Sequence, residues 1–160
     1  MPGLEDLYRE IILDHYRSPR NRGTLETPPA QVAQGHNPLC GDEVQVYLIV
    51  EDGNVKDVKI SGQGCSISQS SASMMSAAVK GKSVHEARRM IDAFRSMMSV
   101  HEHAVAGNQV DHEEPDDYSD VKLGDLEALR GVVKFPVRIK CATLSWNTLT
   151  QALEEATTTV

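Results

Sequence analysis

Hydrophobic residues recur along this chain with two different periods, and the changes of period divide it into helices and strands. Apolar residues at helical spacing over residues 3–16 predict an amphipathic helix. Apolar and polar residues alternate between residues 43 and 51, which predicts a half-buried strand. The turn E-D-G-N then leads into a second strand over about residues 54–61, so the two strands form a hairpin. Residues 30–37 add a third strand with a weaker pattern.

The pattern becomes helical after Cys65. Residues 66–80 predict a helix whose serines can cap its first N–H groups and which stops at Gly81. Ser83 and Glu86 form a capping box for the next helix, whose apolar face runs to Met98. Residues 101–120 contain acidic residues but no Lys or Arg, which predicts a solvated insertion loop. A short helix around 123–131 and a long one from about 138 to 156 follow.

This order of elements, a helix, a small antiparallel sheet and then helices, predicts the α+β class. With 160 residues and no internal repeat, the chain is expected to form a single domain, residues 1–160. A formal net charge of -7 argues against nucleic acid as the main partner. No apolar run reaches the roughly 18 residues that a membrane helix needs, and the start M-P-G-L-E-D does not resemble a signal peptide. We therefore expect a cytoplasmic protein whose thiols stay reduced.

The three cysteines all lie where the predicted structure changes. Cys40 ends the loop before the first hairpin strand, Cys65 separates a strand from a helix, and Cys141 lies near the start of the last helix. The positive end of a helix dipole stabilises an anionic thiolate, which is the form that binds metal or attacks sulfur. Asp42 adds a carboxylate beside Cys40, and Gly41 between them gives the backbone freedom to turn. Three thiolates and one carboxylate make a tetrahedral set suited to zinc.

Other interpretations of these residues remain open at this point. A single buried cysteine is commonly a small core residue, and the chain has no C-x-x-C pair. A nucleophilic cysteine needs a histidine nearby, and His36 is the one close to a cysteine in sequence. His101, His103 and His112 can bind a second metal or simply belong to the solvated acidic loop.

Three separated motifs resemble the SufU branch of the IscU/NifU-like iron–sulfur cluster assembly proteins. They are N-P-L-C-G-D-E, G-Q-G-C-S-I-S-Q-S-S-A-S-M-M and F-P-V-R-I-K-C-A-T-L-S-W, in that order along the chain. The resemblance implies a SufE/NifU-like fold with a three-stranded antiparallel sheet packed by helices. It also implies that the metal ligands are Cys40, Asp42, Cys65 and Cys141.

The same resemblance implies a function. Proteins of the SufU type bind zinc and accept persulfide sulfur from a SufS-like cysteine desulfurase, for delivery to downstream Suf assembly proteins. The family's sulfur-receiving cysteine aligns with Cys141. Arg138, one turn earlier, can pair with Asp42 or with the partner, or it is an ordinary surface arginine. Lys140 stands where IscU-type scaffolds have histidine, and F-P-V-R-I-K replaces their L-P-P-V-K motif. These departures favour zinc-dependent, sulfurtransferase-like transfer over an iron-binding scaffold for a [2Fe–2S] cluster. Both that scaffold and a zinc-stabilised binding module without transfer chemistry remain as alternatives.

Overall fold

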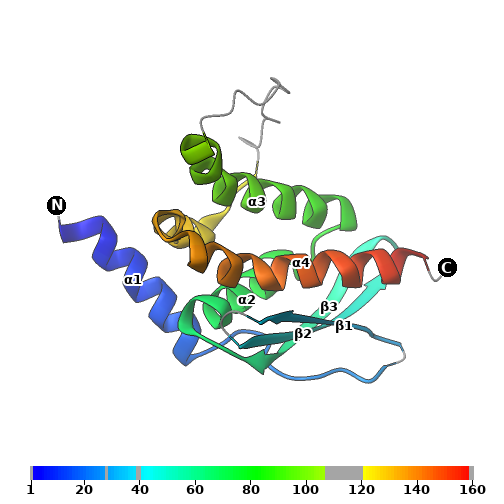
Figure 1. The fold of residues 1–160 in the computed structure, drawn as a ribbon. Coiled ribbons are helices and arrows are strands. Elements are labelled where there is room, and N and C mark those ends of the chain that lie inside the picture. Colours follow the sequence, from blue (N-terminus) through cyan, green and yellow to red (C-terminus); the bar gives the residue numbers. More distant parts are fainter. Residues whose placement is uncertain (1, 28, 39–40, 107–120, 159–160) are drawn as a thin grey trace.

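The computed structural model describes residues 2–27, 29–38, 41–106 and 121–158, and it has the predicted α+β architecture (Figure 1). In chain order its elements are α1 (Pro2–Arg17), β1 (Gln31–Asn37), β2 (Asp42–Glu51), β3 (Asn54–Gln63), α2 (Ser66–Val79), α3 (Val84–Ala106), the 3-10 helix η1 (Gly124–Lys134) and α4 (Pro136–Thr158). The fold class is therefore confirmed, including the weakly predicted strand β1.

The three strands form an antiparallel sheet in the order β1-β2-β3. Between β2 and β3 the chain turns through Asp52 and Gly53, which both have positive φ. Two-residue hairpin turns of this kind match the right-handed twist of the strands that they join. Along β2 the alternation buries Val44, Val46 and Leu48. A register shift at Ile49/Val50 ends this alternation, so Val50 is only half-buried.

The helices cover the sheet in layers (Figure 1). α4 packs on β1 and β2, while α2 packs on β3 and against α4. α3 lies on the side of α4 away from the sheet, and it also contacts η1. Between α3 and α4 the rings of Phe94 and Trp146 stack with centroids 4.5 Å apart, and both side chains are fully buried. Stacked aromatic pairs add to the stability that their burial supplies.

α2 is buried along most of its length although it is rich in serine. Small side chains let it pack closely, and its hydroxyl groups find partners on other elements. Ser71 Oγ donates to the carbonyl oxygen of Ala142 at 2.6 Å and accepts from Trp146 Nε1 at 3.1 Å. Hydrogen bonds of this kind remove the cost of burying polar groups. The buried serines of α2 are Ser68, Ser70, Ser71, Ser73 and Ser76.

Two elements differ from the sequence prediction, one in its end and one in its type of helix. Residues 101–106 continue α3 instead of starting the insertion loop, since no Gly or Pro interrupts the chain before Gly107. The rest of the predicted loop, residues 107–120, lies outside the described residues. The short helix predicted at 123–131 is a 3-10 helix, whose three residues per turn place Leu126, Leu129 and Val132 together on one buried face. None of the described helices combines the length and the apolarity needed to cross a membrane.

Candidate metal centre

Asp42 is the first residue of β2, and its side chain is completely buried. Its Oδ1 accepts a hydrogen bond of 3.0 Å from the backbone N–H of Cys65, and its Oδ2 lies 3.9 Å from Cys65 Sγ. A buried carboxylate is tolerated only where donors or a cation compensate its charge. Asp42 therefore ties the start of β2 to the start of α2.

The glycines of the G-Q-G-C stretch make this approach possible. A Cβ atom added at Gly64 would lie 2.5 Å from Asp42 Oδ1, so any larger residue would displace the carboxylate. Gly62 has a φ of 122°, and a Cβ atom there would clash with the carbonyl oxygen of Glu43 on the neighbouring strand. Both positions need glycine, because the Asp42 carboxylate approaches Gly64 closely and the backbone of Glu43 approaches Gly62 closely.

Cys65 caps α2 with its sulfur atom. Its Sγ accepts a hydrogen bond of 3.4 Å from the N–H of Ser68, three residues further along. The sequence predicted that serines would cap this helix, and that prediction was wrong: the sulfur of Cys65 takes the position at which serine, threonine or aspartate is usual. The cap turns the thiol toward Asp42, and the side chain remains half-buried.

Cys141 lies in the second turn of α4 with none of its surface exposed. Its Sγ accepts from Asn37 Nδ2 at 3.9 Å and donates to the carbonyl oxygen of Val137 at 4.0 Å. Hydrogen bonds at sulfur are longer than those at oxygen and nitrogen. The last residue of β1 and the first turn of α4 therefore both contact this thiol.

Asp42, Cys65 and Cys141 meet at one point. One ligand atom from each residue lies within 4.8 Å of the other two. A tetrahedral zinc ion with bonds of about 2.0–2.3 Å holds its ligand atoms about 3.3–3.8 Å apart, so small side-chain movements bring the three onto a single ion. Within the part of the chain that the structure describes, this is the one such group of His, Cys, Asp and Glu side chains.

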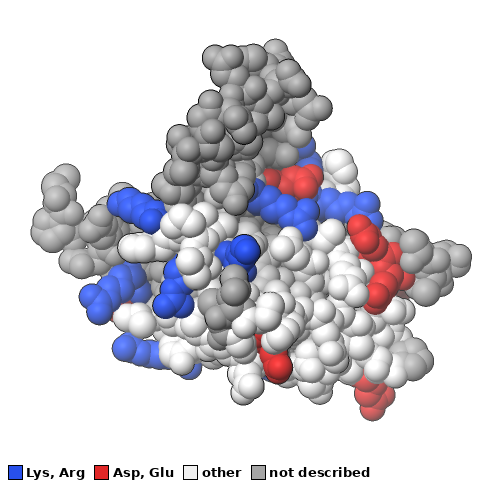
Figure 2. All heavy atoms as spheres, in the orientation of Figure 1, with Lys and Arg blue, Asp and Glu red and all other residues white. Residues whose placement is uncertain are grey.

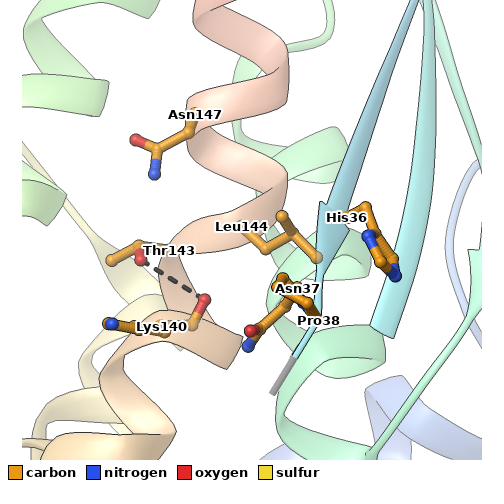
Figure 3. A pocket seen from close by; sticks show the side chains of 7 residues that line it. All are labelled: His36, Asn37, Pro38, Lys140, Thr143, Leu144 and Asn147. Carbon is orange, nitrogen blue, oxygen red and sulfur yellow. Dashed lines mark hydrogen bonds between the residues drawn. The ribbon is translucent and has the colours of Figure 1, made fainter. Parts of the chain in front are cut away.

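Of the other candidate residues, the structure describes only the side chain of His36. Cys40, the fourth predicted ligand, lies outside the described residues. The side chains of His101 and His103 and the whole of His112 lie outside them as well. His36 is exposed near the end of β1, and its ring faces away from α4 (Figure 3).

Arg138 brings a positive charge to the two described thiols. The charges of Cys65 and then of Cys141 are the largest causes that raise the pKa of its guanidinium group, and hydrogen bonds to both sulfur atoms add to the effect. The guanidinium group therefore lies beside the sulfur atoms of both cysteines and interacts with each of them. The Lys140 side chain, in contrast, extends away from Asn37 in Figure 3.

A groove of about 850 Å³ opens beside Cys65, between α1, η1 and the starts of α2 and α4. Its walls are mainly apolar, and Arg9, Lys134 and Arg138 line it with positive charge. Phe135 in this lining and Val137 next to it are both 62% exposed. Figure 2 shows Lys and Arg over α1 and the start of α4, with a second group over α3, whereas most Asp and Glu lie toward the other end of α4. The lining residues are Tyr8, Arg9, Ile12, Leu13, Cys65, Ser66, Ile67, Ala128, Gly131, Val132, Lys134, Phe135 and Arg138.

The fold and the site together define a class: a small α+β protein with a thiol–carboxylate cluster at the meeting point of its sheet and two helices. The sequence model of the NifU-like N terminal domain family matches residues 7–142, and the chain belongs to this family. The resemblance predicted from the three motifs is thereby confirmed.

Similar proteins include enzymes and scaffolds. The zinc-dependent sulfurtransferase SufU of Bacillus subtilis (strain 168) is 45% identical over 146 residues, which cover 91% of this chain and 88% of the relative. The iron-sulfur cluster assembly scaffold protein IscU of Streptococcus pyogenes serotype M1 is 35% identical over 153 residues, 96% of this chain and 86% of the relative. The crystal structure of FiSufU, a proposed SUF-system scaffold from Fervidobacterium islandicum AW-1, matches with a TM-score of 0.74 and 32% identity over 94% of this chain and 99% of that one.

Two residues that the motifs did not mark as functional, Asn37 and His15, are buried and hydrogen-bonded at or near this site. A usable signal existed for Asn37, since it is a polar residue at an inward position of a strand. His15 gave no such signal, because one histidine on an amphipathic helix is ordinary.

Proposed function

We propose that this chain is an iron–sulfur cluster assembly protein that binds zinc and accepts sulfur from the persulfide of a cysteine desulfurase. The observation that carries the proposal is the convergence of Asp42, Cys65 and Cys141, whose ligand atoms lie within 4.8 Å of one another. The similarity to a protein named as a zinc-dependent sulfurtransferase supports it. We further propose that the chain forms one domain, that Cys40 is the fourth ligand, and that the protein works in the cytoplasm.

The donor set fits zinc by its chemistry. Thiolates and a carboxylate oxygen are ligands that zinc accepts in four-coordinate sites. Zinc, when bound, keeps the thiols deprotonated and protects them from oxidation. Asp42 supplies one oxygen to the ion, because its other oxygen is occupied by the N–H of Cys65. Arg138 balances part of the negative charge that three thiolates and a carboxylate bring together.

Sulfur transfer then follows ordinary thiol exchange. The acceptor thiolate attacks the terminal sulfur of the donor persulfide, a new S–S bond forms, and the donor cysteine leaves as a thiolate. We propose Cys141 as the acceptor, at the position implied by the family resemblance. Its complete burial means that docking of the partner has to uncover it, whereas Cys65 is half-buried and lines the groove.

The groove beside Cys65 is the surface that we assign to the desulfurase. Exposed Phe135 and Val137 provide the apolar contact area, and Arg9, Lys134 and Arg138 attract an acidic partner surface. A SufS-like enzyme docked there brings its persulfide to the thiols, and downstream Suf proteins then receive the sulfur.

A second candidate function is that of a scaffold on which a [2Fe–2S] cluster is built. The 35% identity to proteins named as IscU scaffolds favours it, and the same thiolates can ligate iron. Sulfide-dependent visible absorption that survives desalting after anaerobic reconstitution would support this alternative.

The deciding experiment mixes the protein with a SufS-type desulfurase and cysteine, and follows alanine release together with the mass of each cysteine-containing peptide. The wild type is expected to stimulate alanine release and to gain sulfane sulfur on Cys141. Cys141→Ala should abolish both effects, whereas Arg130→Ala, an exposed arginine paired with Glu127, serves as the control and should change neither.

Each of the other outcomes has a clear meaning. Sulfur found on Cys40 or Cys65, with full stimulation by Cys141→Ala, would show that the acceptor is assigned wrongly. A protein that binds zinc but neither stimulates the enzyme nor gains sulfur would be a zinc-stabilised binding module.

A further inference from the structure

Asn37 occupies a junction between the sheet and the candidate metal centre. It is the last residue of β1, it pairs across the sheet with Asp42, and only 6% of its surface is exposed. Its carbonyl oxygen accepts a hydrogen bond of 2.9 Å from Gly41 N–H, which closes the turn that leads into β2. The backbone of Asn37 therefore helps to place Asp42.

The side chain of Asn37 points in another direction, toward the start of α4. Figure 3 shows it at the wall of a cleft of about 480 Å³ between the end of β1 and α4. Its Nδ2 donates to Cys141 Sγ at 3.9 Å, across a separation of 104 residues in the chain. The backbone of Asn37 thus pairs in register with that of Asp42, while its side chain contacts the thiol of Cys141.

We propose that Asn37 is the positioning residue of the metal centre, and that its amide N–H holds the sulfur of Cys141 in line with Asp42 and Cys65. The inference rests on the proposed function only in taking these three residues as metal ligands. A neutral amide suits the task because it donates to a thiolate without competing strongly for the ion. Partners that orient metal ligands in this way typically contribute roughly 10–100-fold to metal affinity.

Cobalt binding to the full chain tests this role without any sulfur transfer. The metal-free protein is titrated with Co²⁺ alone, and both the dissociation constant and the sulfur-to-cobalt charge-transfer absorption are measured. Asn37→Leu and Asn37→Ala both remove the donor, and Leu keeps most of the volume while Ala does not. Asn147→Leu is the matched control, since Asn147 lines the same cleft but bonds to Arg95 and is exposed.

Both Asn37 variants are expected to bind Co²⁺ roughly 10–100-fold more weakly than the wild type, with a changed charge-transfer spectrum. Asn147→Leu should match the wild type in both measurements. A merely structural role of Asn37 would lower the melting temperature but leave the spectrum of the cobalt-bound form unchanged.

Circular dichroism of the metal-free variants checks that they fold. If Asn37→Leu does not fold, Asn37→Ser replaces it with the same expectation, because its hydroxyl is too short to reach the sulfur. Wild-type affinity and spectrum in the Asn37 variants would overturn the inference and leave the proposed metal centre standing. A wild-type protein that binds no cobalt would instead overturn the metal centre, and the inference with it.

Discussion

At the scale of single residues, the two carboxylate oxygens of Asp42 make different contacts. Oδ1 accepts from the N–H of Cys65 and fixes the start of α2, while Oδ2 faces the thiol of Cys65. A carboxylate oxygen is a harder ligand than a thiolate, so in the proposed zinc site Asp42 would be the ligand that a partner displaces most readily. Gly64 secures this arrangement by leaving the carboxylate the space of a missing side chain.

Gly64→Ala is therefore expected to damage the site more than the fold. The added methyl group would lie 2.5 Å from Asp42 Oδ1 and would displace the carboxylate. We expect zinc affinity to fall roughly 10-fold or more, with a loss of about 1–2 kcal/mol in the free energy of unfolding. Competition with a chromogenic chelator measures the affinity, and urea denaturation measures the stability.

Gly131→Ala is the control for this variant, because a Cβ atom at Gly131 meets nothing within 4 Å. It should leave zinc affinity unchanged. Equal zinc affinities for the two variants would contradict the role given to Gly64.

At the scale of elements, His15 joins three helices that surround the site. It lies on α1 and is 3% exposed. Its Nδ1 is 2.8 Å from Ser73 Oγ on α2, and its Nε2 is 3.0 Å from Asp125 Oδ2 on η1. Since α2 begins next to Cys65 and η1 leads into α4, these contacts fix the helices that carry the two thiols.

His15→Ala is expected to lower the free energy of unfolding by about 1–3 kcal/mol, because it leaves a buried hydroxyl without this partner and removes the link to η1. Asp125→Ala should cost less than about 1 kcal/mol, since its side chain is 60% exposed. Urea denaturation of both variants measures the difference. If both variants lost the same free energy of unfolding, the exposed residue Asp125 would contribute as much stability as the buried His15, which would contradict the prediction.

At the scale of the whole molecule, the candidate metal centre joins distant parts of the chain. Asp42 opens β2, Cys65 precedes α2, and Cys141 lies in α4, so a bound ion cross-links the sheet and two helices. Buried negative charge would be left without compensation when the ion is removed. In the proposed site, metal binding and folding are therefore expected to be coupled.

Removal of zinc by a strong chelator should lower the melting temperature. Zinc present at about 1,000 times its dissociation constant stabilises by about 4 kcal/mol, which corresponds to roughly 8–16 °C for a chain of this size. Differential scanning calorimetry with and without chelator measures the shift. Cys65→Ser should melt at the same temperature with and without chelator, and an unshifted wild type would contradict the zinc site.

Most of the secondary structure could be predicted from the sequence, because local patterns decide it. The capping box of α3 is an example: Glu86 N–H donates to Ser83 Oγ at 3.0 Å, and Ser83 N–H lies 3.4 Å from Glu86 Oε2. The strand β1 was harder to predict from the sequence, because Gly35 interrupts its alternation of apolar and polar residues. The structure supplies the reason: a Cβ atom at Gly35 would clash with Thr148 on α4.

The sequence by itself determined the periods of the elements, the α+β class and the position of Cys65 between a strand and a helix, because these depend on neighbours along the chain. The motifs already implied that Asp42, Cys65 and Cys141 share one metal. Only the tertiary structure decided the distances at which they meet, that Cys141 is buried while Cys65 borders a groove, and that Asn37 contacts a thiol 104 residues away. A hydrophobic pattern specifies which face of a helix or strand is buried. Which polar groups that buried face contacts depends on how elements that are distant in sequence pack against one another.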